Sequence, residues 1–212
     1  MSNKLKFVTL LMAVLLVVPA FGQDAPKAEI VGQFSLLRFN PTITGVESHT
    51  SYGGGGSFTY FANKAFGITA EFNGYRGTTI TTKLPANPAY PTGTYASTSG
   101  TQMTYLFGPQ IKFRAGKVAP FGEVLFGSMS TSLYSGLKCQ TCIGSTTLNV
   151  PTQHPFTLAF GGGLDINASP KVAIRLGQFD YLMTRFTNPF TSTNNQNNFR
   201  FQAGVVFKLG SH

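Results

Sequence analysis

Cysteine and histidine are the side chains of this chain whose chemistry could indicate a reactive or metal-binding site. Cys139 and Cys142 are separated by two residues, a spacing found in redox motifs and in one half of a zinc site. The chain has only 2 cysteines, so the second pair that such a zinc site needs is missing. We expect no metal site and favour a short disulfide between Cys139 and Cys142. It would shape the loop around it but add little stability, because the closed loop is small.

A histidine can act as the general base for a neighbouring serine or threonine, and acyl hydrolysis or transfer needs such a pair. His49 and His154 lie near many hydroxyl residues, but neither stands in a recognisable catalytic motif. We interpret both as solvated loop residues and expect no catalytic residue. Two glycine runs, at 53–56 and 161–163, lack the Lys-Ser/Thr that follows a phosphate-binding loop. They indicate tight backbone curvature in a narrow fold, and no cofactor is expected.

The composition predicts an all-β chain with an unusual surface. Charged residues make up 11% of the 212 residues, against about 25% in ordinary soluble domains. Phenylalanine (20), tyrosine (8) and glycine (24) are abundant, which is typical of strands and turns. The net charge of +9 could suit nucleic acid, but no basic cluster is interleaved with base-stacking aromatics, so we expect no nucleic-acid partner. We find no linker and predict one domain.

The N-terminal segment has the pattern of a secretory signal peptide. Lys4 and Lys6 precede an apolar run at 7–18, and small residues follow up to Gly22. The alternative is a membrane anchor, but an anchor needs roughly 20 apolar residues and this run ends at Pro19. We expect residues 1–22 to be removed and residues 23–212 to form the mature domain. Export to an oxidising compartment supports the cysteine disulfide.

Alternation of apolar and polar residues predicts eight strands. Their expected ranges are 28–39, 51–62, 66–76, 101–113, 118–129, 156–167, 171–182 and 199–209. Most are near the roughly 9–11 residues that a tilted strand needs to cross a bilayer. The connections alternate between tight turns and long loops rich in Thr, Ser, Asn, Gly and Pro. This pattern predicts an eight-stranded antiparallel up-and-down transmembrane β-barrel, with short periplasmic turns and long extracellular loops. Pro109, inside one strand, suggests a bulge beside Gly108.

The charges divide between the two faces of these strands. The polar faces carry four acids and four bases, which we predict to lie in the lumen: Glu29, Glu71, Glu123, Asp165, Lys112, Arg175, Arg200 and Lys208. Arg38, Arg76 and Asp180 fall on the apolar faces, at strand ends that lead into long loops. A midplane cation facing lipid costs about 2–4 kcal/mol, so this placement favours a lipid-facing exterior. The alternative is a soluble lipocalin-like barrel with the apolar face inward.

Two interpretations of these charges remain open. An eight-stranded barrel has an interior that side chains can fill, so we favour salt bridges that plug the lumen over a conducting pore. The turn side carries basic residues without an acid among them, at Lys64, Arg114, Lys117, Lys171 and Lys208. We expect them either to contact anionic phospholipid headgroups of the inner leaflet or to be ordinary solvated turn residues.

The signal peptide, the eight alternating strands and the terminal strand together resemble the OmpA-type small outer-membrane β-barrel domain family. The segment 202–209 is similar to the family's C-terminal insertion signal, carried here by Gln202, Gly204, Phe207 and Leu209. The resemblance implies a monomeric protein of the outer membrane of a Gram-negative-type bacterium. Its implied partners are outer-membrane lipid and, during insertion, the barrel-assembly machinery.

We predict a non-enzymatic structural or adhesin-like protein with a plugged lumen that acts through its extracellular loops. A narrow porin-like channel is the second hypothesis, and a lipid A-modifying enzyme is the third. The loops contain no recognisable binding motif, so the sequence names no extracellular ligand.

Overall fold

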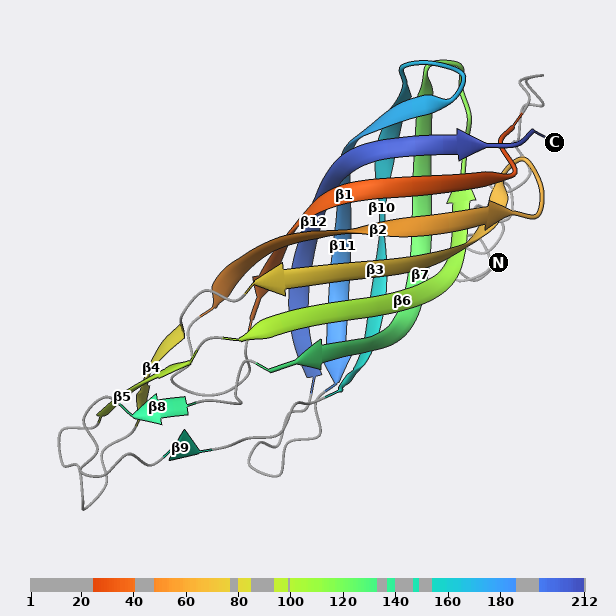
Figure 1. Cartoon of the computed structure of the whole chain (residues 1–212). Helices are drawn as coiled ribbons and strands as arrows, with labels where there is room; N and C mark the ends of the chain where they lie inside the picture. Colours follow the sequence, from red (N-terminus) through yellow and green to blue (C-terminus); the bar gives the residue numbers. More distant parts are fainter. Residues whose placement is uncertain are drawn as a thin grey trace, which may run out of the picture.

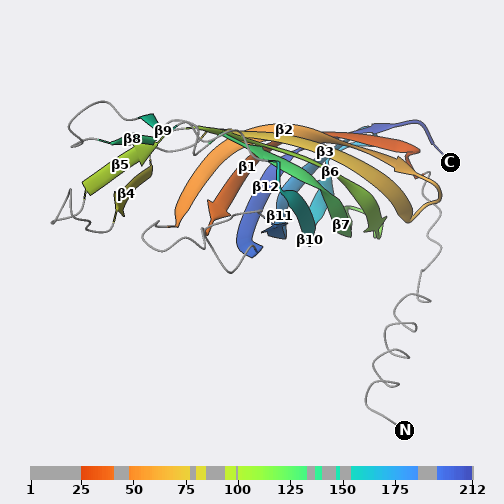
Figure 2. The same cartoon turned by 90° about the horizontal axis from the view of Figure 1, so that it is seen from below.

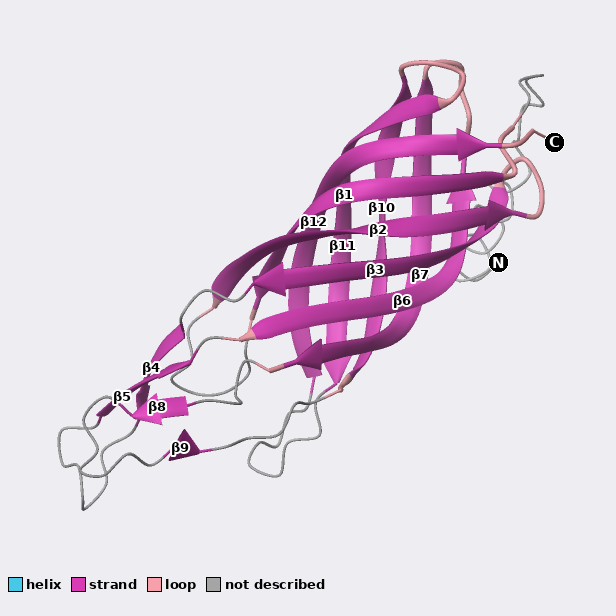
Figure 3. Ribbon diagram, in the orientation of Figure 1, coloured by secondary structure: helices cyan, strands magenta, loops and turns pink. Residues whose placement is uncertain are grey.

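The computed structural model describes residues 25–40, 48–76, 80–84, 94–98, 100–132, 137–139, 147–148, 154–185 and 195–211. Eight strands form a closed barrel: β1 (Ala28–Phe39), β2 (His49–Phe61), β3 (Phe66–Arg76), β6 (Thr101–Lys112), β7 (Val118–Thr131), β10 (Phe156–Asn167), β11 (Val172–Arg185) and β12 (Asn195–Leu209). Each pairs antiparallel with its neighbours, and β1 closes the barrel against β12 (Figure 1). The predicted eight-stranded up-and-down barrel is confirmed. Figure 3 shows strands and loops, and no helix among the described residues is long and apolar enough to span a bilayer.

Tight turns and long loops lie at opposite ends of the barrel. The turns at 62–65, 113–117 and 168–171 share one end with Ala28 and Leu209, and we call this end the turn rim. We call the opposite end the loop rim. Beyond it, strands from two long loops form a separate small sheet, which alternation did not predict (Figures 1 and 2). Its strands are β4 (Ile80–Leu84), β5 (Thr94–Thr98), β8 (Leu137–Cys139) and β9 (Thr147–Leu148).

The barrel has an apolar exterior and a polar interior. In β3, for example, Ile68 and Phe72 are about half exposed, whereas Thr69 and Glu71 between them are buried. The same alternation leaves large apolar side chains on the outside of every barrel strand. A soluble barrel would have its polar faces outward, so the lipocalin-like alternative is wrong. An outer surface of this kind suits hydrocarbon, in which a closed barrel leaves no strand edge unpaired.

A bulge in β11 changes which residues face the lumen. The register of β11 against both neighbours shifts between Arg175 and Gln178, so β11 contains an extra residue there. Before the bulge, the odd-numbered residues of β11 face the lumen, and after it the even-numbered residues do. Asp180 therefore points inward and is only 3% exposed. Its predicted place on the apolar face is wrong for this reason, because a bulge reverses the alternation beyond it.

No bulge forms at Pro109. Phe107 pairs with Phe126 and Gln110 with Glu123, so the β6–β7 register is the same on both sides of the proline. The ladder lacks only the two pairs at Gly108 and Pro109, as expected where one backbone donor is missing. The predicted bulge was therefore wrong.

Inward-facing glycines allow the strands to pack closely. A Cβ atom at Gly55 would lie 2.0 Å from the Phe72 carbonyl oxygen, and one at Gly161 would lie 2.1 Å from that of Phe179. Neither position could hold a side chain without moving backbone. Both glycine runs thus have a structural explanation.

Candidate functional site

Ionised side chains fill much of the barrel interior. All acids among the described residues are inside it and at most 6% exposed: Glu29, Glu71, Glu123, Asp165 and Asp180. Three cations are buried with them: Lys112, Arg175 and Arg200. Each comes from an inward position of a barrel strand, so the network joins strands across the lumen. Seven of the eight residues predicted to line the lumen lie here, and Asp180 was missed.

Lys112 and Arg175 hold the part of the network nearest the turn rim. Lys112 on β6 forms ion pairs with Glu29 on β1 and with Asp165 on β10, the latter at 2.7 Å between Nζ and Oδ2. Arg175 on β11 places Nε 3.0 Å from Oδ1 of the same aspartate. Its guanidinium also lies 4.2 Å from the ring centroid of Phe121, a cation–π contact inside the lumen.

Arg200 holds the central part of the network. Its guanidinium forms an ion pair with Glu71 on β3. Both Nε and Nη2 lie 2.8 Å from Oδ2 of Asp180 on β11. The arginine side chain is completely buried, so removal of either acid would leave it with one anionic partner and no solvent to replace the other.

Glutamine side chains connect the two parts. Gln178 accepts a hydrogen bond from Arg175 at 2.7 Å and donates to Glu123 at 2.8 Å and to Asp180 at 3.0 Å. Gln110 donates to the other oxygen of Glu123 at 2.9 Å. Among the described residues, Glu123 is the one buried acid that accepts from amides and forms no ion pair.

A cluster of apolar side chains is buried between this network and the loop rim. Leu37, Phe39, Tyr75, Leu106, Leu125, Met129, Ala159 and Leu182 form one buried cluster, contributed by six barrel strands. A path along the barrel axis would have to pass both this apolar layer and the interlocked ion pairs. Both sets of side chains fill the interior and contribute to its packing.

The turn-rim end of the network differs from the prediction. Lys208 is opposite Glu29 in the β1–β12 ladder, but its amine bonds Oδ1 of Asn167 at the rim instead. Arg114, in the turn at 113–117, pairs with Glu29 at 3.3 Å. Burial lowers the pKa of Arg114, while Glu29 opposes this shift. The predicted balance of four acids and four bases is therefore replaced by five buried acids, three buried cations and Arg114 at the edge.

The missed residues left a partial signal in the sequence. In the β11 sequence, the apolar residues that face outward have even numbers before Gly177, as Ile174 does. After Gly177 they have odd numbers, as Phe179 does. This change of phase could have placed Asp180 inside. The roles of Gln110 and Gln178 depend on which residues lie across the lumen, which alternation cannot provide.

The remaining predicted sites have simpler surroundings. In the proposed insertion signal, Gln202 is buried in the lumen and Phe207 and Leu209 are exposed outside. A Cβ at Gly204 would lie 2.1 Å from the carbonyl oxygen of Gly32. Residues 1–22, the predicted signal peptide, lie outside the described residues. So does Cys142, and the side chain of Cys139 is not described, so the disulfide remains a prediction.

The two candidate histidines both lie near the loop rim, one in β2 and the other just before β10, and these strands are not neighbours in the barrel. His49 is at the start of β2, and its ring centroid lies 5.2 Å from that of Phe39. Nδ1 of His154 lies 3.2 Å from the hydroxyl of Tyr105. Within the described ranges, no group of three or more His, Cys, Asp or Glu side chains could hold a metal ion.

Three solved outer-membrane proteins are similar to this chain. Neisserial surface protein A has a TM-score of 0.58 and 13% identity, covering 88% of this chain and 100% of that one. OprG of Pseudomonas aeruginosa has a TM-score of 0.55 and 11% identity, covering 90% and 99%. The attachment invasion locus protein Ail of Yersinia pestis, solved with the heparin analogue sucrose octasulfate, has a TM-score of 0.52 and 14% identity, covering 87% and 99%. No protein-family model and no curated protein sequence matches the chain. This chain therefore has the fold of the small eight-stranded outer-membrane β-barrel proteins.

Proposed function

We propose that this protein is a monomeric, non-enzymatic surface protein of the outer membrane of a Gram-negative-type bacterium and acts through its extracellular loops. The observation that carries the proposal is the filled lumen. Buried ion pairs and an apolar cluster occupy much of the interior, which supports a structural role for the lumen over a conducting one. The part of the molecule that acts on a partner would then be its outer surface.

The loop rim is where a partner would meet the protein. Two long loops contribute strands to the sheet β4-β5-β8-β9, which extends beyond the barrel (Figure 1). A sheet fixes the backbone of loops that would otherwise lose much entropy on binding, so it favours recognition. Lys83 lies in β4 and Lys138 in β8, and these two strands contain no acid. Ail, which shares the fold, is named for attachment and was solved with a sulfated sugar. We therefore choose a polyanionic glycan as the first probe.

The test compares cells that display three forms of the protein. One form is intact, one has residues 77–100 and 133–153 replaced by short turns, and a matched control has only residues 186–194 shortened. We expect the intact form and the control to bind heparin-coated surfaces or host-cell layers, and the loop-replaced form to lose binding. If the loop-replaced form binds as well as the intact form, the loop sheet is not the recognition surface.

If the protein is a narrow channel, it should conduct ions in planar bilayers, whereas a plugged surface protein should not. Steady ion-selective openings of refolded protein that lumen-charge variants abolish would favour a channel over the plugged surface protein.

A lipid A-modifying enzyme would instead remove or transfer acyl chains of lipid A that is incubated with the purified protein. The variant His154→Ala would then lack this activity.

A further inference from the structure

A cavity opens at the turn-rim mouth of the barrel. It has a volume of about 450 Å³, within the roughly 300–1,000 Å³ range of small-molecule clefts. Its lining combines the end of the lumen network with residues of two tight turns and the last strand. The charged and polar lining residues are Glu29, Lys112, Arg114, Lys117, Asn167, Ser169 and Lys208.

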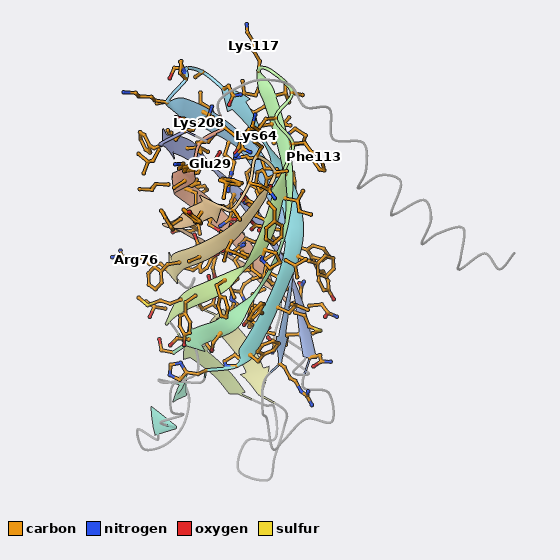
Figure 4. All side chains as sticks on the ribbon, turned by 90° about the vertical axis from the view of Figure 1, so that its right-hand side faces the viewer. Glu29, Lys64, Arg76, Phe113, Lys117 and Lys208 are labelled. Atoms are coloured by element: carbon orange, nitrogen blue, oxygen red, sulfur yellow. The ribbon has the colours of Figure 1, made fainter. Side chains whose placement is uncertain are left out.

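The charge of this cavity is strongly positive. Four of the lining side chains are cations, and Glu29 is the single acid. Glu29 already has two ion-pair partners, Lys112 and Arg114. Among the described residues, Lys117 and Lys208 form no ion pair, and Lys208 bonds the neutral Asn167. Figure 4 shows both lysines at the same end of the barrel as Glu29. The cavity therefore has two cationic groups that no described acid pairs with directly.

The cavity also lies at the level where the apolar exterior ends. Val118, the residue after Lys117, is 39% exposed, and Phe207, the residue before Lys208, is 49% exposed. Both belong to the apolar exterior, so the two lysines stand next to the boundary of the hydrocarbon. Headgroup phosphates occupy this level in a bilayer.

We propose that the turn-rim cavity binds a phosphate group, which Lys117 and Lys208 contact and Arg114 and Lys112 attract at longer range. Lysine ammonium groups pair with phosphate oxygens through charge-assisted hydrogen bonds. The phosphate can belong to an anionic lipid headgroup or to a soluble phosphate ester, since both present the same oxygens. The proposal does not depend on what the extracellular loops bind.

The same rim offers a matched control for the experiment. Lys64 and Lys171 are exposed cations of the other two turns, but neither lines the cavity. Lys117→Gln/Lys208→Gln and Lys64→Gln/Lys171→Gln therefore remove the same charge from the same rim. Heat-modifiable migration on a gel verifies that each variant folds.

Binding is measured on the full protein in detergent by native mass spectrometry, separately with phosphatidylglycerol and with glycerol 3-phosphate. We expect the cavity pair to weaken binding about tenfold or more and the control pair to change it less than about threefold. Binding of the lipid alone identifies a headgroup site, and binding of both ligands identifies a site for phosphate esters in general. Equal loss in the two variants would show a diffuse basic rim and overturn the proposal, as would the absence of binding to either ligand.

Discussion

Asp180 lies directly opposite Arg200 in the β11–β12 ladder, and the two side chains meet inside the barrel at 2.8 Å. Uninterrupted alternation along β11 would have put Asp180 in lipid. The bulge after Arg175 instead provides the acid that Arg200 needs in addition to Glu71. A local irregularity of one strand thus completes the central part of the lumen network.

Truncation of Arg200 should destabilise the barrel severely. In Arg200→Met, the buried Glu71 and Asp180 both lose their cation, and breaking a buried pair in this way costs about 3–5 kcal/mol. Urea unfolding of the protein in lipid vesicles measures the loss. Arg38→Met is the control, because this arginine is exposed near the loop rim, and its unfolding midpoint should be almost unchanged.

Glu123 should respond differently from the other buried acids. It accepts hydrogen bonds from Gln110 and Gln178 and has no cation to lose. In Glu123→Gln, the new side chain can still accept from Gln178, and once the Gln110 amide turns over it can donate to Oε1 of Gln110, which has no partner in the structure. We expect Glu123→Gln to retain or gain stability in the same urea assay. Glu71→Gln, which removes a partner of Arg200, should lose stability, and an equal loss in both would contradict the assigned roles.

Glycines on one strand pair should differ sharply in their tolerance of alanine. A Cβ at Gly55 would lie 2.0 Å from the Phe72 carbonyl oxygen, whereas a Cβ at Gly74 would meet nothing within 4 Å. Gly55→Ala should therefore impair formation of the barrel, and Gly74→Ala should fold normally. Heat-modifiable migration after refolding distinguishes the two results, and normal folding of Gly55→Ala would show that β2 and β3 can separate.

The apolar exterior predicts a penalty for charge. Phe72 is 53% exposed and lies near the middle of β3, so Phe72→Arg should cost about 2–4 kcal/mol in a bilayer. Phe72→Leu preserves the apolar surface and should cost much less. If unfolding in vesicles shows no difference between the two variants, this face does not contact hydrocarbon.

The alternation of apolar and polar residues predicted the strands well, because one face of each strand meets an apolar exterior and the other a polar lumen. Every barrel strand was found, and the largest differences are at the loop rim, where β11 extends to Arg185 and β12 begins at Asn195. Contacts across the lumen could not be predicted. They depend on register, and the bulge in β11 and the pairing of Lys208 with Asn167 are both set by neighbouring strands.

The sheet beyond the loop rim could not be read from the sequence for another reason. The segments that form it are rich in Thr and Ser, and its two longest strands, Ile80–Leu84 and Thr94–Thr98, span only five residues each. Their pairing joins two loops far apart in the chain, as in Ala96 opposite Cys139. Such short strands carry too little alternation to be distinguished from a loop.

The basic turn rim also has a consequence for the direction in which the barrel enters a membrane. A rim of lysines and arginines would have to give up its hydration to cross hydrocarbon, which is costly. The two loops that form the outer sheet carry only Lys83 and Lys138 as fixed charges in residues 77–100 and 130–155. The exposed Arg38, Arg76 and Arg185 lie at the strand ends behind these loops, so we expect the loop segments themselves to cross more easily than the turns. We therefore expect the loops to lead during insertion and the turn rim to stay behind.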